Sequence, residues 1–237
     1  MNKQVLSLRL MQVGKQVPQG ARLADIGSDH AYLPTYLMLN QKISFAVAGE
    51  VVKGPYESAK KQVEKNHLAD KITVRLADGL AAIHAEDQIN AISIAGMGGS
   101  LIRKILESGK QQGQLTGQET LILQPNVGEP TLREWLVAND YQITYEEILE
   151  ENQKIYEIIV ANPGNEITYT KKELFFGPHL LKNRSPIFLQ KWKKEVANKK
   201  RVLSELNKAQ EAPLGKIEEV QEQLKWIEEV LNEWFMA

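Results

Sequence analysis

The sequence predicts an α/β fold built on a mostly parallel sheet and followed by a hairpin of long helices. From residue 21 to about residue 161, short apolar runs alternate with helical patterns, as expected for a parallel sheet covered on both faces. The last two apolar runs lie too close together for a crossover helix, and after Pro163-Gly164 the apolar period becomes helical. With 237 residues, the chain can form one full-sized core and a small helical domain.

The apolar runs predict seven strands. They cover residues 22–26, 45–48, 72–75, 91–94, 120–123, 141–149 and 155–160. The first five alternate with helical segments and should be parallel. Only residues 150–154 separate the last two, so these strands should pair antiparallel as a hairpin.

The C-terminal region is expected to contain two helices, residues 185–208 and 214–235, separated at Glu211-Ala212-Pro213 because proline breaks a helix. Apolar residues at three- and four-residue intervals should form the seam between the helices. They are Leu203, Leu206, Val220, Leu224, Ile227 and Leu231. We therefore divide the chain into an α/β domain, residues 1–164, and a helical hairpin domain, residues 165–237.

The composition excludes several classes of protein. The chain has no cysteine, which rules out disulfides, Cys-ligated zinc, iron–sulfur clusters and thiol nucleophiles, and we expect no metal. Residues 1–13 should form an amphipathic helix and lack the apolar core of a signal peptide, and no apolar run reaches 18 residues. We expect no membrane association and a cytoplasmic protein, and the sequence does not indicate an oligomeric state.

Positive charge is concentrated in one segment. Residues 1–170 carry 16 Lys and Arg against 20 Asp and Glu, residues 171–201 carry 10 against 2, and residues 202–237 carry 3 against 8, for a total of −1. A charge run on a helix is usually a solvated face. Because the helix expected to pair with this segment is acidic, a binding surface for a polyanion is the alternative.

The first strand ends in Asp25 and then turns on Gly27 into a helix. A glycine here lets the backbone pass close to a ligand at the carboxyl edge of the sheet. Dinucleotide binders usually place three glycines in this turn to admit a pyrophosphate, and this turn has one. The turn therefore favours a cofactor without phosphate, S-adenosylmethionine (SAM), over NAD, although a strand-to-helix turn that merely needs one glycine is an equal alternative.

Two further acids follow strands at the same edge. Glu50, with Val51, ends the second strand about 20 residues beyond the glycine turn, where a carboxylate can accept both ribose hydroxyls of a cofactor. Asp78-Gly79 follows the third strand and can meet an adenine. A solvated acid at a strand end and a plain Asp-Gly turn are the structural alternatives.

The fourth strand ends in the most specific signature of the chain. In residues 94–100, Ile-Ala-Gly-Met-Gly-Gly-Ser, three glycines occur within four positions, which leaves the backbone free to approach cofactor and substrate together. A flexible loop does not account for a helix that starts at once, at residues 101–106. Gln124-Pro125-Asn126 closes the fifth strand at the same edge, where we expect it to line the mouth of the substrate site.

Five parallel strands followed by a hairpin are typical of SAM-dependent methyltransferases, and the motifs closely resemble the TrmK family of bacterial tRNA (adenine-N1)-methyltransferases, which modify adenosine 22 in the D-arm. The resemblance covers residues 1–165 in motif detail and the helical tail in architecture only. It rests on Leu6-Ser7, Arg9-Leu10, the run from Asp25 to Pro34, Gly54-Pro55, Asp78-Gly79-Leu80 and the run from Ile94 to Gly99.

The resemblance implies a Rossmann-like domain, SAM as methyl donor and tRNA as substrate. The cofactor site it implies comprises Asp25, Gly27, Ser28, Asp29, His30, Glu50, Val51, Asp78, Gly79, Ala95, Gly96, Met97 and Gly98. As RNA-binding residues we expect Arg9, Tyr32, Lys191, Lys193, Lys194, Lys199, Lys200 and Arg201.

For the mechanism, we expect direct displacement, in which the lone pair of adenine N1 attacks the methyl group without prior loss of a proton. Catalysis then consists of positioning and electrostatics. Asp29 is the candidate carboxylate for the positive charge that develops on the base, and it is an equal candidate for the methionine moiety. His30 is as well suited to a structural hydrogen bond as to handling a proton.

On the RNA side, Tyr32 is a candidate to receive an adenosine that has left its stack, and packing behind the first helix is its alternative. Arg9 can meet an RNA phosphate or bridge to a nearby acid. Two other functions are weighed for the whole chain. They are methylation of another RNA or of a small molecule, and RNA binding without catalysis by a protein that keeps a vestigial cofactor pocket.

Overall fold

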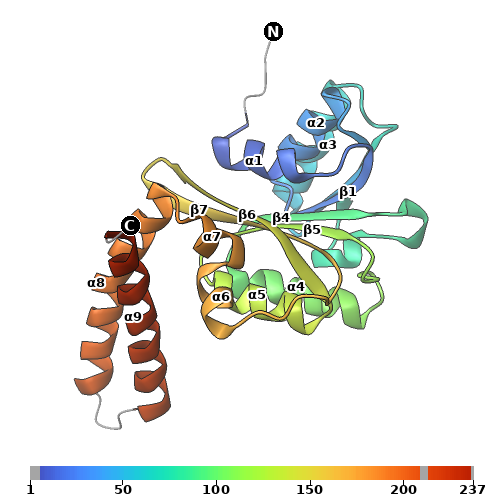
Figure 1. Cartoon of the computed structure of the whole chain (residues 1–237). Helices are drawn as coiled ribbons and strands as arrows, with labels where there is room; N and C mark the ends of the chain where they lie inside the picture. Colours follow the sequence, from blue (N-terminus) through green and yellow to red (C-terminus); the bar gives the residue numbers. More distant parts are fainter. Residues whose placement is uncertain (1–5, 209–212, 236–237) are drawn as a thin grey trace. The chain divides into compact units, whose positions relative to one another are not determined.

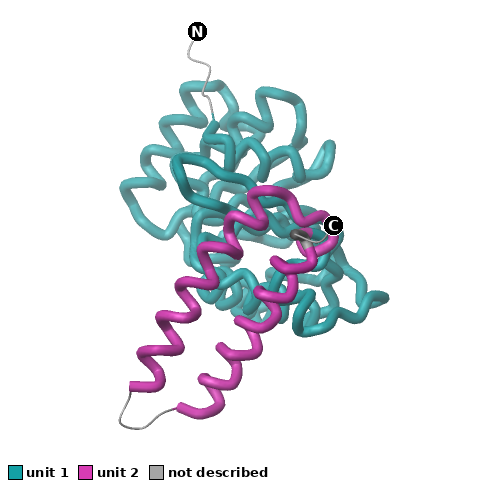
Figure 2. Tube along the Cα trace, turned by 60° about the vertical axis from the view of Figure 1, so that its left-hand side comes forward, with its two compact units in different colours: residues 1–179 teal, residues 180–237 magenta. Residues whose placement is uncertain are grey.

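The structure is a computed structural model that describes residues 6–208 and 213–235, with side chains through residue 233. The chain forms two compact units, residues 1–179 and residues 180–237 (Figure 2). The division expected from the sequence, into an α/β domain of residues 1–164 and a helical hairpin domain of residues 165–237, stays a prediction. The parts of the sequence predictions that fall on residues 1–5, 211 and 212 lie outside the described residues.

The first unit contains a seven-stranded sheet in the order β3-β2-β1-β4-β5-β7-β6 (Figure 1). Its strands are β1 (Ala21–Ile26), β2 (Ile43–Glu50), β3 (Ile72–Leu76), β4 (Ala91–Met97), β5 (Thr120–Pro125), β6 (Tyr141–Glu151) and β7 (Lys154–Pro163). The first five are parallel, and β7 runs antiparallel to both β5 and β6. This confirms the predicted Rossmann-like α/β class.

Every predicted strand lies inside an observed one, and each observed strand is longer than its prediction. The strands extend past their apolar runs because ladder hydrogen bonds continue where side chains become polar. The β6–β7 hairpin closes on Asn152 and Gln153, with φ of 51° and 63°. Positive φ at both central positions matches the right-handed twist of paired strands, and this explains so tight a turn.

The helices of the first unit alternate with the strands. They are α1 (Leu8–Gln16), α2 (Tyr32–Leu39), α3 (Lys53–Lys65), α4 (Gly99–Gln111), α5 (Glu129–Ala138) and α6 (Lys171–Phe176), with the 3-10 turns η1 (Gly79–Ala82) and η2 (Ala85–Asp87). Figure 1 shows α1, α2 and α3 on one face of the sheet and α4 and α5 on the other. Two apolar cores separate accordingly, one under α1–α3 and one under α4 and α5.

Helix α1 starts later than the sequence suggested. The Ser7 side chain accepts the backbone N–H of Leu10, and the Glu151 carboxylate accepts the backbone N–H of Leu8 at 2.6 Å. Both contacts satisfy amides that a helix N-terminus leaves without partners. The start of α1 is thereby fastened to the end of β6.

The β6–β7 end of the sheet contains a fully buried ion network. Arg133 of α5 donates to Glu146 of β6 at 2.6 Å and to Glu157 of β7 at 2.5 Å. Burial lowers the pKa of Arg133, but the two carboxylates raise it further, so the net shift is upward. Arg133 also donates to the carbonyl of Leu174 in α6, and Glu146 accepts the backbone N–H of His179. The residues after the hairpin are therefore held by this network.

The second unit is a hairpin of two long helices, α8 (Pro186–Lys208) and α9 (Leu214–Phe235), as predicted, and α7 (Pro178–Asn183) precedes them. Val220 and Ile227 of the predicted seam are buried, whereas Leu203, Leu206, Leu224 and Leu231 are half-buried. Ile217 and Val230, which the prediction omitted, are buried instead. The short helices α6 and α7 were also not predicted.

Candidate active site

The acids and glycines singled out in the sequence lie at the carboxyl edge of the sheet. Strands β1, β2 and β4 end side by side there, with Ile26 paired to Gly49 and to Ile94. Strand β5 joins the same edge, where Met97 pairs with Pro125. Loops after these four strands therefore meet at the position where open α/β sheets bind ligands.

Asp25 is a buried carboxylate that organises the first turn. One of its oxygens accepts the Ser28 hydroxyl and the other accepts the Ser93 hydroxyl, each at 2.6 Å. Burial raises the pKa of Asp25, and the two hydroxyl groups partly offset that rise. Ser93, in the middle of an apolar strand, is a residue that sequence reasoning missed. Its hydroxyl is matched to an acid on the neighbouring strand.

The turn after β1 is conformationally demanding. Gly27 has φ of +68°, and a Cβ added there would lie 2.2 Å from Met97 Cε. Asp29, His30 and Ala31 follow with φ of 46°, 67° and 56°. Positive φ at three successive non-glycine residues costs energy that neighbouring contacts must offset, and such strain concentrates at functional sites.

Contacts to the end of β2 hold this turn in place. The backbone N–H groups of Gly27 and Ser28 donate to the Gly49 carbonyl at 2.9 and 3.2 Å, and the backbone N–H of His30 donates to the Glu50 carboxylate. The Asp29 side chain is 75% exposed, with Oδ1 3.5 Å from His30 Nε2. The structure thus places Asp29 at the surface of the site and Ser28 beneath it.

Glu50 has an unused hydrogen-bonding oxygen. The residue is only 6% exposed, and its Oε1 atom is buried with no hydrogen-bond partner among the described residues. Burial raises the pKa of Glu50, the His30 N–H lowers it, and the charges of Asp25 and Asp29 raise it again. A buried acceptor without a donor is costly and needs an explanation, and the role predicted for Glu50, to accept ribose hydroxyls of a cofactor, would supply donors for this oxygen.

Asp78 and Gly79, which the sequence predicted to contact the adenine, border a cavity. Asp78 is exposed after β3, and Gly79 has φ of +54° at the start of η1. A cavity of about 230 Å³ lies between η1 and α4, with Asp78, Gly79, Leu101 and Ile105 among its lining residues. Val51, also predicted to contact the cofactor, is 65% exposed at the same edge.

The glycines at the end of β4 and the start of α4 have different structural roles. A Cβ on Gly99 would lie 2.3 Å from the Gly128 carbonyl oxygen, so Gly99 permits α4 to pack against the loop after β5. Gly96 has φ of +81°. Gly98 has an ordinary φ of −72°, and the nearest protein atom to an added Cβ is 4.0 Å away. An added Cβ at Gly98 would therefore make only an ordinary contact with Val127.

The Gln124 side chain does not line the substrate mouth as expected, because it is fully buried. Its Oε1 accepts the Gly96 N–H at 3.0 Å and also the guanidinium of Arg9. Asn126, which is exposed, donates to the Gly96 carbonyl at 2.8 Å. Gln124 lies beneath the mouth because its polar atoms are needed to satisfy backbone and guanidinium groups there.

Two predicted RNA contacts lie on the first unit. Arg9 is half-buried, with its guanidinium 5.5 Å from the centre of the Tyr156 ring, and it bonds to an amide rather than to the acid that was its alternative. Tyr32 is 38% exposed, and its ring lies 5.4 Å from that of His30. An exposed aromatic ring beside the glycine turn is available for stacking against a base.

The predicted lysine cluster on α8 is partly engaged within the hairpin. Lys199 donates to Gln223, Lys200 pairs with Glu228 at 3.0 Å, and Arg201 donates to Asn198 at 3.1 Å. Burial lowers the pKa of Lys199. The ammonium of Lys191 lies 5.3 Å from the Trp192 ring. Lys199 and Lys200, two of the cations predicted to bind RNA, thus form their contacts with side chains of α9.

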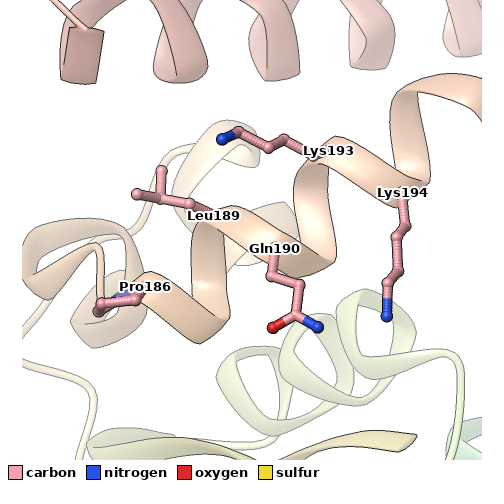
Figure 3. Close-up of a pocket in the computed structure, with 5 residues that line it drawn as sticks. All are labelled: Pro186, Leu189, Gln190, Lys193 and Lys194. Atoms are coloured by element: carbon pink, nitrogen blue, oxygen red, sulfur yellow. The ribbon is translucent and has the colours of Figure 1, made fainter. Parts of the chain in front are cut away.

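Two of the lysines border an open hollow of about 380 Å³ on the second unit. Its lining residues are Pro186, Leu189, Gln190, Lys193 and Lys194 (Figure 3). In Figure 3, Lys193 and Lys194 project from α8 in different directions. They do not form one continuous charged face.

Two of the sequence expectations concern membranes and metals. Within residues 6–208 and 213–235, no helix is long and apolar enough to cross a membrane. In the same part of the chain, no group of three or more His, Cys, Asp and Glu side chains is arranged to hold a metal ion.

Known proteins resemble this chain over nearly its whole length. The family described as TrmK, tRNA (adenine(22)-N(1))-methyltransferase, matches residues 23–229. The enzyme of that name from Bacillus subtilis strain 168 is 44% identical over 98% of this chain and 99% of its own.

Solved structures of proteins with related names are also similar to this chain. The B. subtilis m1A22 tRNA methyltransferase TrmK superposes with a TM-score of 0.89 at 42% identity, covering 97% of this chain and 100% of the other. The Streptococcus pneumoniae protein Sp1610, in complex with S-adenosyl-L-methionine, has a TM-score of 0.85 at 47% identity, with 96% and 100% covered. M. capricolum TrmK, in complex with the cofactor product S-adenosyl-homocysteine, has a TM-score of 0.83 at 30% identity, with 96% and 98% covered. With the match over residues 23–229, these similarities show that the chain belongs to the TrmK family of tRNA (adenine(22)-N(1))-methyltransferases.

Proposed function

We propose that this chain transfers a methyl group from SAM to N1 of adenosine 22 in the D-arm of tRNA, in the cytoplasm. The cofactor part of the proposal is supported by the buried Glu50 Oε1 atom at the carboxyl edge of the sheet, which has no partner among the described residues. The acceptor part is supported by membership of the TrmK family. Solved relatives hold SAM and S-adenosyl-homocysteine. The carboxylates and the glycine turn at this edge of the sheet fit the same cofactor.

Four segments would hold the cofactor. Glu50 accepts the ribose hydroxyls, Asp78 and Gly79 meet the adenine, and residues 27–31 carry the backbone past the methionine moiety. The cavity beside Asp78 has Leu101 and Ile105 among its lining residues, and apolar side chains suit the faces of a purine ring. When bound, SAM supplies an electrophilic methyl group on a sulfonium.

The protein's contribution to the transfer is placement and electrostatics. Adenine N1 carries a lone pair in the ring plane and no proton, so no general base is required. We expect base and methyl group to meet beside Gly98, where an added Cβ would only touch Val127 among the described residues. The Asp29 carboxylate is the candidate partner for the positive charge of the methylated base. Because Asp29 is 75% exposed, its effect grows when bound RNA excludes water.

On the RNA side, Tyr32 offers an exposed ring for the target base, and Arg9 offers a guanidinium for a phosphate. Lys194 is exposed on α8 beside the hollow of the second unit. Together with the neighbouring cations of α8, it would contact the RNA backbone.

The test is methyl transfer from labelled SAM to an unmodified tRNA transcript, with a transcript carrying guanosine at position 22 as control. We expect label only in the transcript with adenosine 22, at N1 after nuclease digestion. SAM binding by calorimetry is measured in parallel. SAM binding without transfer to any tRNA would assign the chain to another acceptor, and absence of SAM binding would favour an RNA-binding protein with a vestigial pocket.

A further inference from the structure

We propose that Gln124 is a positioning residue that holds the Arg9 guanidinium as an oxyanion-binding group beside Gly96, at the end of β4. The oxyanion is a phosphate of the acceptor RNA. This inference rests on the proposed function and deepens it, because it names how the acceptor is held at the site.

The hydrogen-bonding capacity of Gln124 is fully used. Its Oε1 accepts from the Gly96 N–H and from Arg9, and its Nε2 donates to the Pro125 carbonyl at 2.8 Å and to Asn126 Oδ1 at 3.3 Å. A buried amide has two acceptor lone pairs and two N–H groups, so each is matched. The amide consequently has one orientation, and it couples the end of β4 to the helix α1.

Arg9 is restrained at three points. Its backbone N–H lies 3.4 Å from Glu151, its Nη1 donates to Gln124, and its guanidinium lies 5.5 Å from the Tyr156 ring centre. A Cβ built on Gly96 would lie 3.4 Å from Nη1. Ordering a long side chain costs conformational entropy. Because the Arg9 side chain is already ordered in the folded protein, a ligand that binds it loses less free energy to that ordering.

The partner of the guanidinium is neutral. Among the described residues, its contacts are the Gln124 amide oxygen and the Tyr156 ring, and none of their carboxylates forms an ion pair with it. A carboxylate at position 124 would hold the guanidinium equally well but would cancel its charge. The amide fixes the direction of the cation and leaves its positive charge and remaining N–H donors for an external anion.

The site's chemistry favours a phosphate over a base as the partner. The target adenine becomes positively charged on methylation, so a fixed cation against the ring would oppose the reaction. A phosphate carries a full negative charge and matches the guanidinium fork. The carboxylate of the cofactor's amino-acid portion offers the same oxyanion chemistry, and the experiment separates the two sources.

The experiment compares Gln124→Glu, Arg9→Ala and the double variant in the full-length chain. It measures kcat and KM for tRNA, the salt dependence of tRNA binding, SAM affinity by calorimetry, and thermal unfolding. Gln118→Glu is the matched charge control, because Gln118 is exposed before the amino end of β5.

We expect Gln124→Glu to raise the KM for tRNA about tenfold or more, as Arg9→Ala does, for a lost charge-assisted contact. The salt slope should flatten by about 0.7–0.9, the losses in the double variant should be smaller than the sum of the two single losses, and the control should behave as the unsubstituted chain. If both single variants weaken SAM instead of tRNA, the oxyanion is the cofactor carboxylate and Gln124 keeps its role. Wild-type KM and SAM affinity in Gln124→Glu, or losses that add in full to those of Arg9→Ala, would overturn the inference.

Arg9→Lys keeps the test valid if Gln124→Glu fails to fold. Lysine retains the charge but lacks the guanidinium fork that Gln124 and Tyr156 hold. If Gln124 positions the cation, Arg9→Lys should raise the KM for tRNA as Arg9→Ala does. A KM and a salt dependence like those of the unsubstituted chain would contradict the role of Gln124. An unsubstituted chain that fails to methylate tRNA would refute the proposed function itself, which is a separate outcome.

Discussion

Replacing Glu50 tests the cofactor site most directly, because function and stability should change in opposite directions. In Glu50→Ala, the ribose loses a buried carboxylate whose Oε1 has no partner among the described residues. Charge-assisted hydrogen bonds contribute about 1.5–3 kcal/mol. SAM affinity should therefore fall by about 10- to 150-fold in isothermal titration calorimetry.

Glu50→Gln separates the charge from the shape. The pKa of Glu50 is raised in the folded chain, mainly by burial, so the folded state binds the proton more tightly than the unfolded state. The ionised carboxylate thus destabilises the fold above its ordinary pKa, and the cost grows as pH rises through the folded-state value. At pH 7 we expect Glu50→Gln to raise the Tm of the cofactor-free protein and to weaken SAM binding, and near pH 4 the gain in Tm should vanish.

The refuting results are specific. Unchanged SAM affinity in a well-folded Glu50→Ala variant would remove Glu50 from the site. A Tm at pH 7 that falls in Glu50→Gln would show that the ionised carboxylate stabilises the fold, and that the partnerless oxygen does not signal a ligand.

Four further predictions concern the glycines, the domain boundary and the lysines. Gly27→Ala should lower the free energy of unfolding, measured with denaturant, by about 1–3 kcal/mol, because φ at Gly27 is +68° and an added Cβ would clash with Met97. Gly54→Ala is the control, and it should be neutral or slightly stabilising because a Cβ there would meet open space. Gly98→Val should leave the Tm unchanged but abolish turnover, and full activity in it would show that the loop is only a connector. A chain ending at residue 164 should unfold at lower temperature than one ending at residue 183, because the latter keeps the contacts to the buried ion network; equal Tm values would contradict this. Lys194→Ala should weaken tRNA binding and flatten the dependence of log affinity on log salt concentration by about 0.7–0.9, while Lys225→Ala on α9 should change neither. Equal effects of the two substitutions would show that both lysines act only through the overall positive charge of the protein.

The sequence predictions about the site can be compared with the structure residue by residue. The glycine turn, Glu50, Asp78 and the loop after β4 lie at one sheet edge, as their positions after successive parallel strands required. Sequence reasoning missed Ser93 and misplaced Gln124. Both are polar residues within or just after apolar strands, where nothing in the local pattern reveals the partner on the next strand. Whether each predicted residue contacts cofactor or RNA stays a prediction.

The α/β class, all seven strands, the β6–β7 hairpin and the two long helices could be predicted from the sequence alone. These features follow from the period of apolar residues and from turn chemistry, which are local properties of the chain. The sequence did not reveal that the Gln124 amide oxygen accepts from both Arg9 and Gly96, that Arg133 is buried between two carboxylates, or that Lys200 pairs with Glu228. A polar or charged group acts through its partner, and these partners lie from 13 to 115 residues away in the chain, so the folded structure is needed to identify them.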